Sequence, residues 1–291
     1  MKSNNPTNVD FSQIISDHFN DLTKSEKRIA NYLRKNQEES AFLSASELAD
    51  RLGLSEATMV RFARTMGFPS YPAMRTLLQE NFRQRVTHSA RLRSRLDDLR
   101  EAGDIFEQVT VSEIDYLTQA LQSVKREAIN QAVDLIINCD HVFVYGTGPS
   151  LTLVDLINVR LARFGKQVIQ LTTAGREVLE PLLLMSERDL LFAIGFFDVH
   201  PTLQIVLNHA NEVKCPVVLL TDTLGSIIGN KADVILAAKR GPVSAFHSLV
   251  VPMTIINTLL LAFANQNQEE VLKNLDKLDH LRSRLKNFNE S

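Results

Sequence analysis

One stretch, Ser44–Gly67, constrains the fold most, because it reads as two helices joined by a tight turn. Its sequence is S-A-S-E-L-A-D-R-L-G-L-S-E-A-T-M-V-R-F-A-R-T-M-G. Gly53 stands where the first helix should end, since glycine adopts the left-handed conformation without a Cβ clash. Ser55 follows as a cap for the second helix. The apolar residues are spaced to form facing inner stripes on the two helices: Leu48, Leu52, Leu54, Met59 and Phe62. The pattern predicts a helix-turn-helix.

The outward edge of the second helix is the candidate DNA-binding surface, because a helix-turn-helix presents this edge to the major groove. Arg61 and Arg64 are the candidates for base or phosphate contacts, and Arg75 on a later helix could reach a phosphate. The remaining members of the edge are the cap and three residues of the first turn: Ser55, Glu56, Ala57 and Thr58. A helical hairpin that merely packs inside a larger domain is the alternative, which apolar periodicity alone does not exclude.

The distribution of charge along the 291 residues agrees with a polyanion partner for the front of the chain only. Residues 1–100 carry a net charge of +4, whereas the remaining residues carry −6. The excess is modest, so the placement of individual cations must matter more than their number. The length allows two domains, each with its own core.

Neither the two cysteines nor the N-terminus indicates secretion. Cys139 and Cys215 adjoin apolar, strand-like runs, which is typical of buried thiols in a reducing compartment. The N-terminal residues lack the apolar core of a signal peptide. The apolar part of the longest uncharged run, residues 248–264, is shorter than the ~20 residues of a membrane span. We therefore expect a cytoplasmic protein without a membrane partner, and this run as a buried or subunit-contacting helix.

The first domain is expected to be an all-α bundle over residues 1–83. Phe11–Phe19, Thr23–Lys35 and Ala73–Arg85 read as further helices, and Thr23 with Glu26 forms a capping box. A helical linker is expected over 84–125. It contains most of a run of six arginines (83, 85, 91, 93, 95 and 100), which is typical of a solvated helix and could also contact phosphates.

Short apolar runs alternate with helical segments over residues 126–291. The runs are His141–Tyr145, Gln167–Leu171, Leu190–Ile194, Pro216–Leu220 and Val234–Ala237. The helical segments are Leu151–Phe164, Gly175–Met185, Thr202–Val213, Ala245–Asn265 and Gln268–Asn287. Continuous apolar strands with intervening helices indicate a three-layer, doubly wound α/β domain around a parallel five-stranded sheet. Ligands of such sheets bind at the carboxyl ends of the strands.

Loops at these strand ends supply the candidate ligand-binding residues. The loop Tyr145–Ser150, Y-G-T-G-P-S, lets the backbone approach an anion, although a tight turn without a ligand explains its glycines nearly as well. The candidates are Gly146, Thr147, Gly148, Ser150, Gly195, His200, Thr221 and Ser248. Nucleotide-binding spacings such as G-x-G-x-x-G are absent from the sequence. We expect no cofactor and no metal.

An isomerase or lyase would need a carboxylate or histidine placed between adjacent substrate carbons. Glu177, Glu180, His200 and His247 are the candidates, and none comes with a recognised catalytic motif. We therefore expect no enzyme activity. A sugar-phosphate isomerase or lyase with an accessory helical domain remains the alternative, and a dimerisation scaffold without ligand is a third hypothesis.

Three stretches resemble the N-terminal domain of the RpiR/MurR family of bacterial transcriptional regulators, namely Leu22–Leu33, Ser46–Arg64 and Met66–Phe68. Residues 126–264 resemble the sugar isomerase (SIS) domain of the same family. The resemblance implies a homodimeric or homotetrameric regulator that binds a double-stranded DNA operator. Its SIS domain would sense a small-molecule effector, commonly a phosphosugar, without turnover.

The second ligand loop departs from the family pattern. The usual S-x-S-G-x-T falls on Gly195–His200, where every hydroxyl is lost. The usual Ser-Arg is Ser248–Leu249, and a frequent later Asp is Asn257. Two effector classes therefore stay open, a phosphosugar and a less charged catabolic metabolite such as an amino acid, a purine catabolite or a carboxylate. The expected function is a metabolite-responsive regulator, as a repressor, of a catabolic operon.

Overall fold

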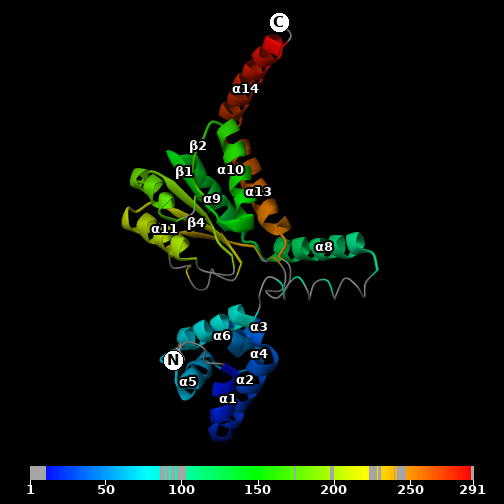
Figure 1. Ribbon diagram of the computed structural model, residues 1–291, viewed down its shortest axis with the longest axis vertical. Coiled ribbons are helices and arrows are strands. Elements are labelled where there is room, and N and C mark those ends of the chain that lie inside the picture. Colours follow the sequence, from blue (N-terminus) through cyan, green and yellow to red (C-terminus); the bar gives the residue numbers. More distant parts are fainter. Residues whose placement is uncertain are drawn as a thin grey trace, which may run out of the picture. The chain divides into compact units, whose positions relative to one another are not determined.

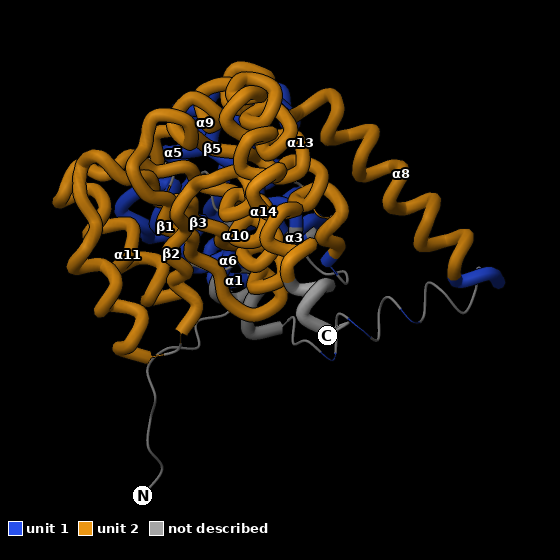
Figure 2. Tube along the Cα trace, turned by 90° about the horizontal axis from the view of Figure 1, so that it is seen from above, with its two compact units in different colours: residues 1–105, 242–247 blue, residues 106–241, 248–291 orange. Residues whose placement is uncertain are grey.

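The computed structural model of the chain forms two compact units, residues 1–105 with 242–247 and residues 106–241 with 248–291 (Figure 2). It describes residues 11–85, 89, 92, 96, 103–173, 175–196, 200–222, 228, 231–238, 240 and 247–289. All four arginines of the run beyond residue 85 (91, 93, 95 and 100) lie outside the described residues.

The first unit is a bundle of short helices, as the sequence predicts (Figure 1). The elements are α1 (Phe11–His18), η1 (Phe19–Asp21), α2 (Lys24–Lys35), α3 (Gln37–Ser40), α4 (Ala45–Leu52), α5 (Glu56–Thr65) and α6 (Tyr71–Arg85). The expected helix-turn-helix is α4–α5. Its inner positions Leu48, Met59 and Phe62 are fully buried.

Capping and turn chemistry explain where these helices begin and end. Gly53 ends α4 with φ of 60°, the left-handed conformation expected of it. The Ser55 Oγ accepts a hydrogen bond from the Thr58 N–H at 3.3 Å and so caps α5. The Arg28 side chain of α2 donates to the Leu52 carbonyl at 2.8 Å, which fastens the end of α4 to the bundle.

The second unit is an α/β domain whose five parallel strands have the order β2-β1-β3-β4-β5. The strands are β1 (His141–Tyr145), β2 (Gln167–Leu171), β3 (Leu190–Ile194), β4 (Val217–Thr221) and β5 (Val234–Ala237). The helices are α8 (Ile105–Ser123), α9 (Arg126–Asn138), η2 (Gly148–Ser150), α10 (Leu151–Arg163), η3 (Gly175–Leu184), α11 (Pro201–Glu212), α13 (Val250–Gln266) and α14 (Gln268–Asn289). The direction of winding reverses between β1 and β3, which makes this pair the topological switch point.

Helices cover both faces of the sheet, as the continuous apolar strands require (Figure 1). On one face α9, α10 and α13 bury residues such as Ile136, Leu153 and Ile256. On the other, η3 and α11 bury Val178 and Leu207. Both faces are closed by side chains, so the strand ends are where a ligand can reach the sheet.

The structure departs from the sequence expectation in two segments. The helix expected at Gly175–Met185 is the 3₁₀ helix η3, which contains Pro181, a residue that cannot donate an α-helical hydrogen bond. The expected connector ends in α8, whose Tyr116, Leu117 and Ala120 pack against the core of the second unit.

Both cysteines are buried and free, as expected. Burial raises the pKa of the Cys139 thiol to about 11 and that of Cys215 to about 12, so both stay protonated near neutral pH. Among the helices that the structure describes, none is long and apolar enough to cross a membrane.

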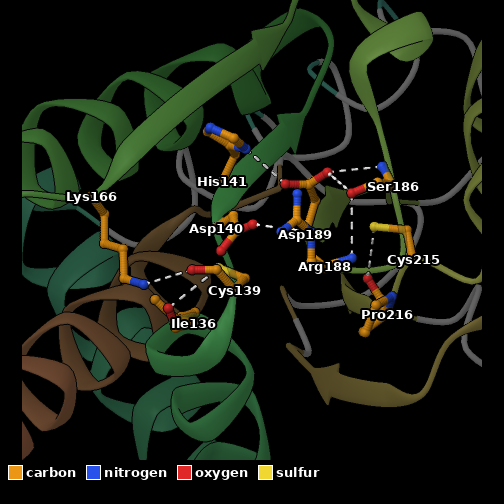
Figure 3. Close-up of polar contacts among 10 residues, drawn as sticks. All are labelled: Ile136, Cys139, Asp140, His141, Lys166, Ser186, Arg188, Asp189, Cys215 and Pro216. Carbon is orange, nitrogen blue, oxygen red and sulfur yellow. Dashed lines mark hydrogen bonds and ion pairs between the residues drawn. The ribbon is translucent and has the colours of Figure 1, made fainter.

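A buried carboxylate joins the amino ends of β1 and β3 (Figure 3). Asp189, 3% exposed, lies 2.8 Å from the His141 Nδ1 and accepts hydrogen bonds from the Ser186 N–H and hydroxyl at 2.8 and 2.7 Å. Burial by itself would raise the pKa of Asp189, but these hydrogen bonds outweigh it and the pKa lies below the ordinary carboxyl value. The carboxylate therefore stabilises the fold in its charged form.

Asp189→Asn should lower the free energy of unfolding by about 2 kcal/mol at pH 7, because a buried, hydrogen-bonded charge is lost. A lowered pKa contributes stability above the ordinary carboxyl pKa and loses it as pH falls through the folded value. The difference between the two proteins in urea unfolding should therefore shrink below about pH 4. Asp140→Asn is the matched control, since the Asp140–Arg188 pair is exposed and should contribute under about 1 kcal/mol. Equal losses for the two variants would contradict this assignment.

Candidate DNA-binding and effector-binding sites

The candidate DNA-binding edge of α5 is open to solvent, whereas its opposite side is core. Glu56, Ala57, Arg61 and Arg64 are exposed beside the Ser55 cap. The Arg61 Nη2 donates to the Thr58 Oγ1 at 3.2 Å, which holds the guanidinium along this edge. The structure thus brings six of the seven predicted DNA-binding residues onto one helix and its cap.

A groove of about 530 Å³ lies between the N-terminus of α2 and α5. Its lining combines both arginines with hydroxyls and one carboxylate: Thr23, Ser25, Glu26, Thr58, Arg61, Arg64 and Thr65. Glu26 connects the two helices, because its carboxylate accepts from the Thr23 N–H and hydroxyl of α2 at 3.0 and 2.7 Å and from the Thr65 hydroxyl of α5 at 2.8 Å. Sequence reasoning identified Glu26 as a cap and missed its contact with α5, which is 39 residues away.

The charge of Glu26 is stabilised by this arrangement. Burial would raise the pKa of its carboxyl group, but the hydrogen bonds from Thr23 and Thr65 and the positive charge of Arg61 outweigh it, so the pKa is lowered. The carboxylate therefore holds α5 through Thr65 and attracts the Arg61 guanidinium at the same time.

Arg75 differs from the other predicted DNA contacts. It lies on α6, is 8% exposed, and its charge acts on Tyr71 and Glu47 within the bundle. Its burial disfavours a phosphate contact, because a phosphate needs an accessible guanidinium.

The first candidate ligand loop, Gly146–Ser150, connects β1 to α10 through η2. A Cβ on Gly146 would lie 2.7 Å from the Val154 Cγ2, so glycine is needed for the close approach of the loop to α10. Gly148 has φ of 55°, which also favours glycine, and Thr147 is exposed while Ser150 is buried. The loop follows the carboxyl end of β1, beside the switch point, where ligands of such sheets bind.

The other predicted ligand residues already serve the fold in part. The ring of His200 accepts a hydrogen bond from the Thr202 N–H at 3.3 Å and caps α11. The Ser248 hydroxyl donates to the Glu113 carboxylate of α8 at 2.6 Å and accepts from the Val250 N–H. Thr221 ends β4 fully buried, and Gly195 follows β3. Phe197, Asp198 and Val199 lie outside the described residues.

A buried arginine that sequence reasoning missed lies at the same edge of the sheet. Arg240, 7% exposed, follows β5 and donates from Nη2 to the Asp222 carboxylate at 3.0 Å. Its guanidinium carbon lies 3.8 Å from the centroid of the Phe196 ring. The signal that could have found it is the pair of adjacent cations Lys239 and Arg240, shortly after a strand in a part of the chain with net negative charge.

Three of the four candidates for acid–base catalysis lie in the second unit, and His247 is grouped with the first. Glu177 and Glu180 are exposed on η3, and His200 is occupied as a helix cap. Among the described residues, no group of three histidine, cysteine or carboxylate side chains could hold a metal ion.

Comparison with known families gives one match for each unit. Residues 9–85 match the helix-turn-helix domain of the rpiR family, and residues 135–262 match the SIS domain. These matches cover α1–α6 in the first unit and the sheet with its helices from late α9 into α13 in the second.

Relatives that match most of the chain include proteins named as regulators. An uncharacterised HTH-type transcriptional regulator of Thermotoga maritima is 24% identical over 277 residues, covering 92% of this chain and 96% of that protein. The regulator HexR of Pseudomonas aeruginosa is 24% identical over 252 residues, covering 84% and 86%.

Two solved structures share the fold. The Vibrio vulnificus NanR protein complexed with ManNAc-6P is 22% identical with a TM-score of 0.65, covering 95% of this chain and 99% of that one. The sugar isomerase domain of an RpiR transcription factor from Sphaerobacter thermophilus is 28% identical with a TM-score of 0.57, covering 60% and 98%. The chain therefore belongs to the RpiR family of helix-turn-helix transcriptional regulators, with an N-terminal DNA-binding domain and a C-terminal SIS domain.

Proposed function

We propose that this regulator is a cytoplasmic repressor of a catabolic operon that releases its operator when the SIS domain binds a small-molecule effector. It acts as a homodimer or homotetramer, so that two α5 helices enter successive major grooves about 34 Å apart or a multiple of that distance. The contacts to bases or phosphates come from Arg61 and Arg64. The residues near base edges are Glu56, Ala57 and Thr58, and Ser55 caps the helix. The observation that carries the proposal is the exposed α5 edge within the rpiR-family domain.

The effector binds at the carboxyl edge of the sheet, where the loop after β1 meets the loop after β3. Gly146, Thr147, Gly148 and Ser150 form one side of this site, with Gly195, His200, Thr221 and Ser248 as candidates on the other. A phosphosugar is supported by the NanR complex with ManNAc-6P. A catabolic metabolite of lower charge is supported by the hydroxyl-free second loop.

Catalysis by the SIS domain is disfavoured. The candidate acid–base residues lack a catalytic motif, and the relatives that span most of the chain are named as transcriptional regulators. We therefore propose that the effector is bound and released unchanged.

Arg61→Ala should weaken operator binding by about tenfold or more, because a charge-assisted contact at a base or phosphate is lost. If the contact is to a phosphate, the slope of log affinity against log salt should also flatten by about one unit. Fluorescence anisotropy with a labelled operator fragment at several salt concentrations measures both quantities.

Arg188→Ala is the control for loss of one arginine, because Arg188 is an exposed residue of the second unit. It should leave affinity and salt slope unchanged. Unaltered operator affinity in correctly folded Arg61→Ala would show that the assigned DNA-binding edge is wrong.

Glu26→Gln should weaken operator binding by about fivefold, because the loss of charge frees the Arg61 guanidinium and weakens the hold on Thr65. Glu47→Gln is a matched control, since Glu47 forms the equivalent capping box with Ser44 at the start of α4. Both variants should lose a similar stability of about 1 kcal/mol from their caps.

Operator affinity and thermal unfolding, measured on both variants, separate positioning from capping. A lower affinity in Glu26→Gln alone supports the positioning role. Equal changes in affinity would mean that Glu26 is a helix cap and nothing more.

A further inference from the structure

We propose that α8 is an arm that covers the exposed face of α13 in a second copy of this chain, while the α8 of that copy covers the same face here. The inference rests on the proposed homo-oligomer, and it adds the two surfaces through which the copies associate. Each contact then occurs twice, as in any interface built around a two-fold axis.

An apolar stripe on α8 is the first surface. Val111, Ile114, Thr118 and Leu121 follow one another at spacings of three and four residues, so they lie on one side of the helix. All four are exposed, Ile114 by 56% and Leu121 by 70%. The Thr118 hydroxyl donates to the Ile114 carbonyl at 2.8 Å, so its donor is satisfied within the helix. A contiguous stripe of this kind indicates a contact with another surface.

The attachment of α8 to its own domain leaves this stripe uncovered. Tyr116, Leu117 and Ala120, on another side of the helix, pack against the core of the second unit. The Glu113 carboxylate accepts from the Ser248 hydroxyl, just before α13, at 2.6 Å. Figures 1 and 2 show α8 running away from the sheet, and none of its 19 residues is buried.

The outward side of α13 is the second surface. Residues 248–264 carry no charge. The exposed positions on this side are Met253, Thr254, Asn257, Thr258 and Leu261. The Thr254 and Thr258 hydroxyls donate to carbonyls one turn earlier in the helix at 2.8 Å. An apolar helix packed on this side therefore leaves these two donors satisfied.

The charges around the two surfaces are complementary. The charged residues of α8 are all acidic, namely Glu107, Glu113 and Asp115. α10 carries Arg160 and Arg163 in its last turn. This end of α10 adjoins α13, because the Phe164 ring stacks on that of Phe263 with centroids 6.1 Å apart. An acidic α8 is thus attracted to the α10–α13 side of a second copy, whereas two α8 helices repel each other.

The size of α8 suits a reciprocal contact. Its 19 residues form a rod roughly 28 Å long and about 10 Å wide. One such footprint, counted on both surfaces and in both symmetry-related contacts, removes roughly 1,100 Å² from water. A specific interface needs about 1,000 Å², so two contacts are sufficient and one is not.

The molar mass of the full-length protein in solution tests the inference, measured by light scattering after size exclusion at micromolar concentration. Ile114→Lys with Leu121→Lys alters the α8 stripe, and Met253→Glu with Leu261→Glu alters the α13 face. Each double variant should raise the dissociation constant about a hundredfold or more and halve the mass, because the contact would bury unpaired charges. The four side chains are exposed, so circular dichroism should show an unchanged fold.

An equimolar mixture of the two double variants separates the proposed pairing from other pairings. A mixed dimer has one contact with wild-type residues on both sides and one contact in which lysines face glutamates. The mixture should therefore recover the wild-type mass. If α8 paired with α8 instead, every mixed dimer would retain lysines against a wild-type stripe, and mixing would restore nothing.

Leu183→Lys with Leu184→Lys is the matched control, because these leucines are 86% and 70% exposed on η3, which covers the opposite face of the sheet. It should keep the wild-type mass. The inference is overturned if the α8 or the α13 variant also keeps that mass, if the control loses it equally, or if the mixture stays dissociated. A wild type that is itself monomeric contradicts the proposed oligomer as well, whereas a wild-type dimer that the variants leave intact contradicts this inference alone.

Discussion

Burial of apolar surface decides where each domain of this regulator can act. The parallel sheet packs helices on both faces, so a ligand reaches it at the carboxyl ends of the strands, where the loops after β1, β3, β4 and β5 are anchored. In the same way, Met59 and Phe62 bury one side of α5 in the bundle and leave the opposite edge, the proposed DNA-binding surface, exposed. The surfaces available for binding are those that packing of the two cores leaves unburied.

Much of this organisation could be predicted from the sequence, because its signals are local. Continuous apolar runs located all five strands to within one residue. Gly53 and Ser55 marked the turn between α4 and α5, because glycine favours the left-handed conformation that ends a helix and serine caps the next one. The candidate sites were less accessible to such reasoning. The contacts of Glu26 with Thr65, Ser248 with Glu113 and Arg240 with Phe196 join residues far apart in the chain, so no local pattern announces them. The burial of Arg75 likewise depends on how α6 packs.

The two domains use charge in different ways. At the proposed DNA-binding edge, Arg61 and Arg64 are exposed, and the partly covered carboxylate of Glu26 attracts the Arg61 guanidinium. At the edge of the sheet, one buried arginine is balanced by one carboxylate and covered by an aromatic ring. A long polymer of phosphates suits the first arrangement. The second takes a charged pair out of water inside the domain, which is unfavourable unless the pair is well compensated.

In the proposed function, the N-terminal domain binds a specific operator and the C-terminal domain adjusts that affinity. Selection of bound fragments from sheared genomic DNA by the intact protein, with random DNA as competitor, tests it most directly. We expect fragments from promoter regions to be recovered with a preference of roughly 10³-fold or more over random DNA, and a metabolite extract to weaken their retention. Recovery of fragments without any sequence preference, with and without the extract, would contradict it.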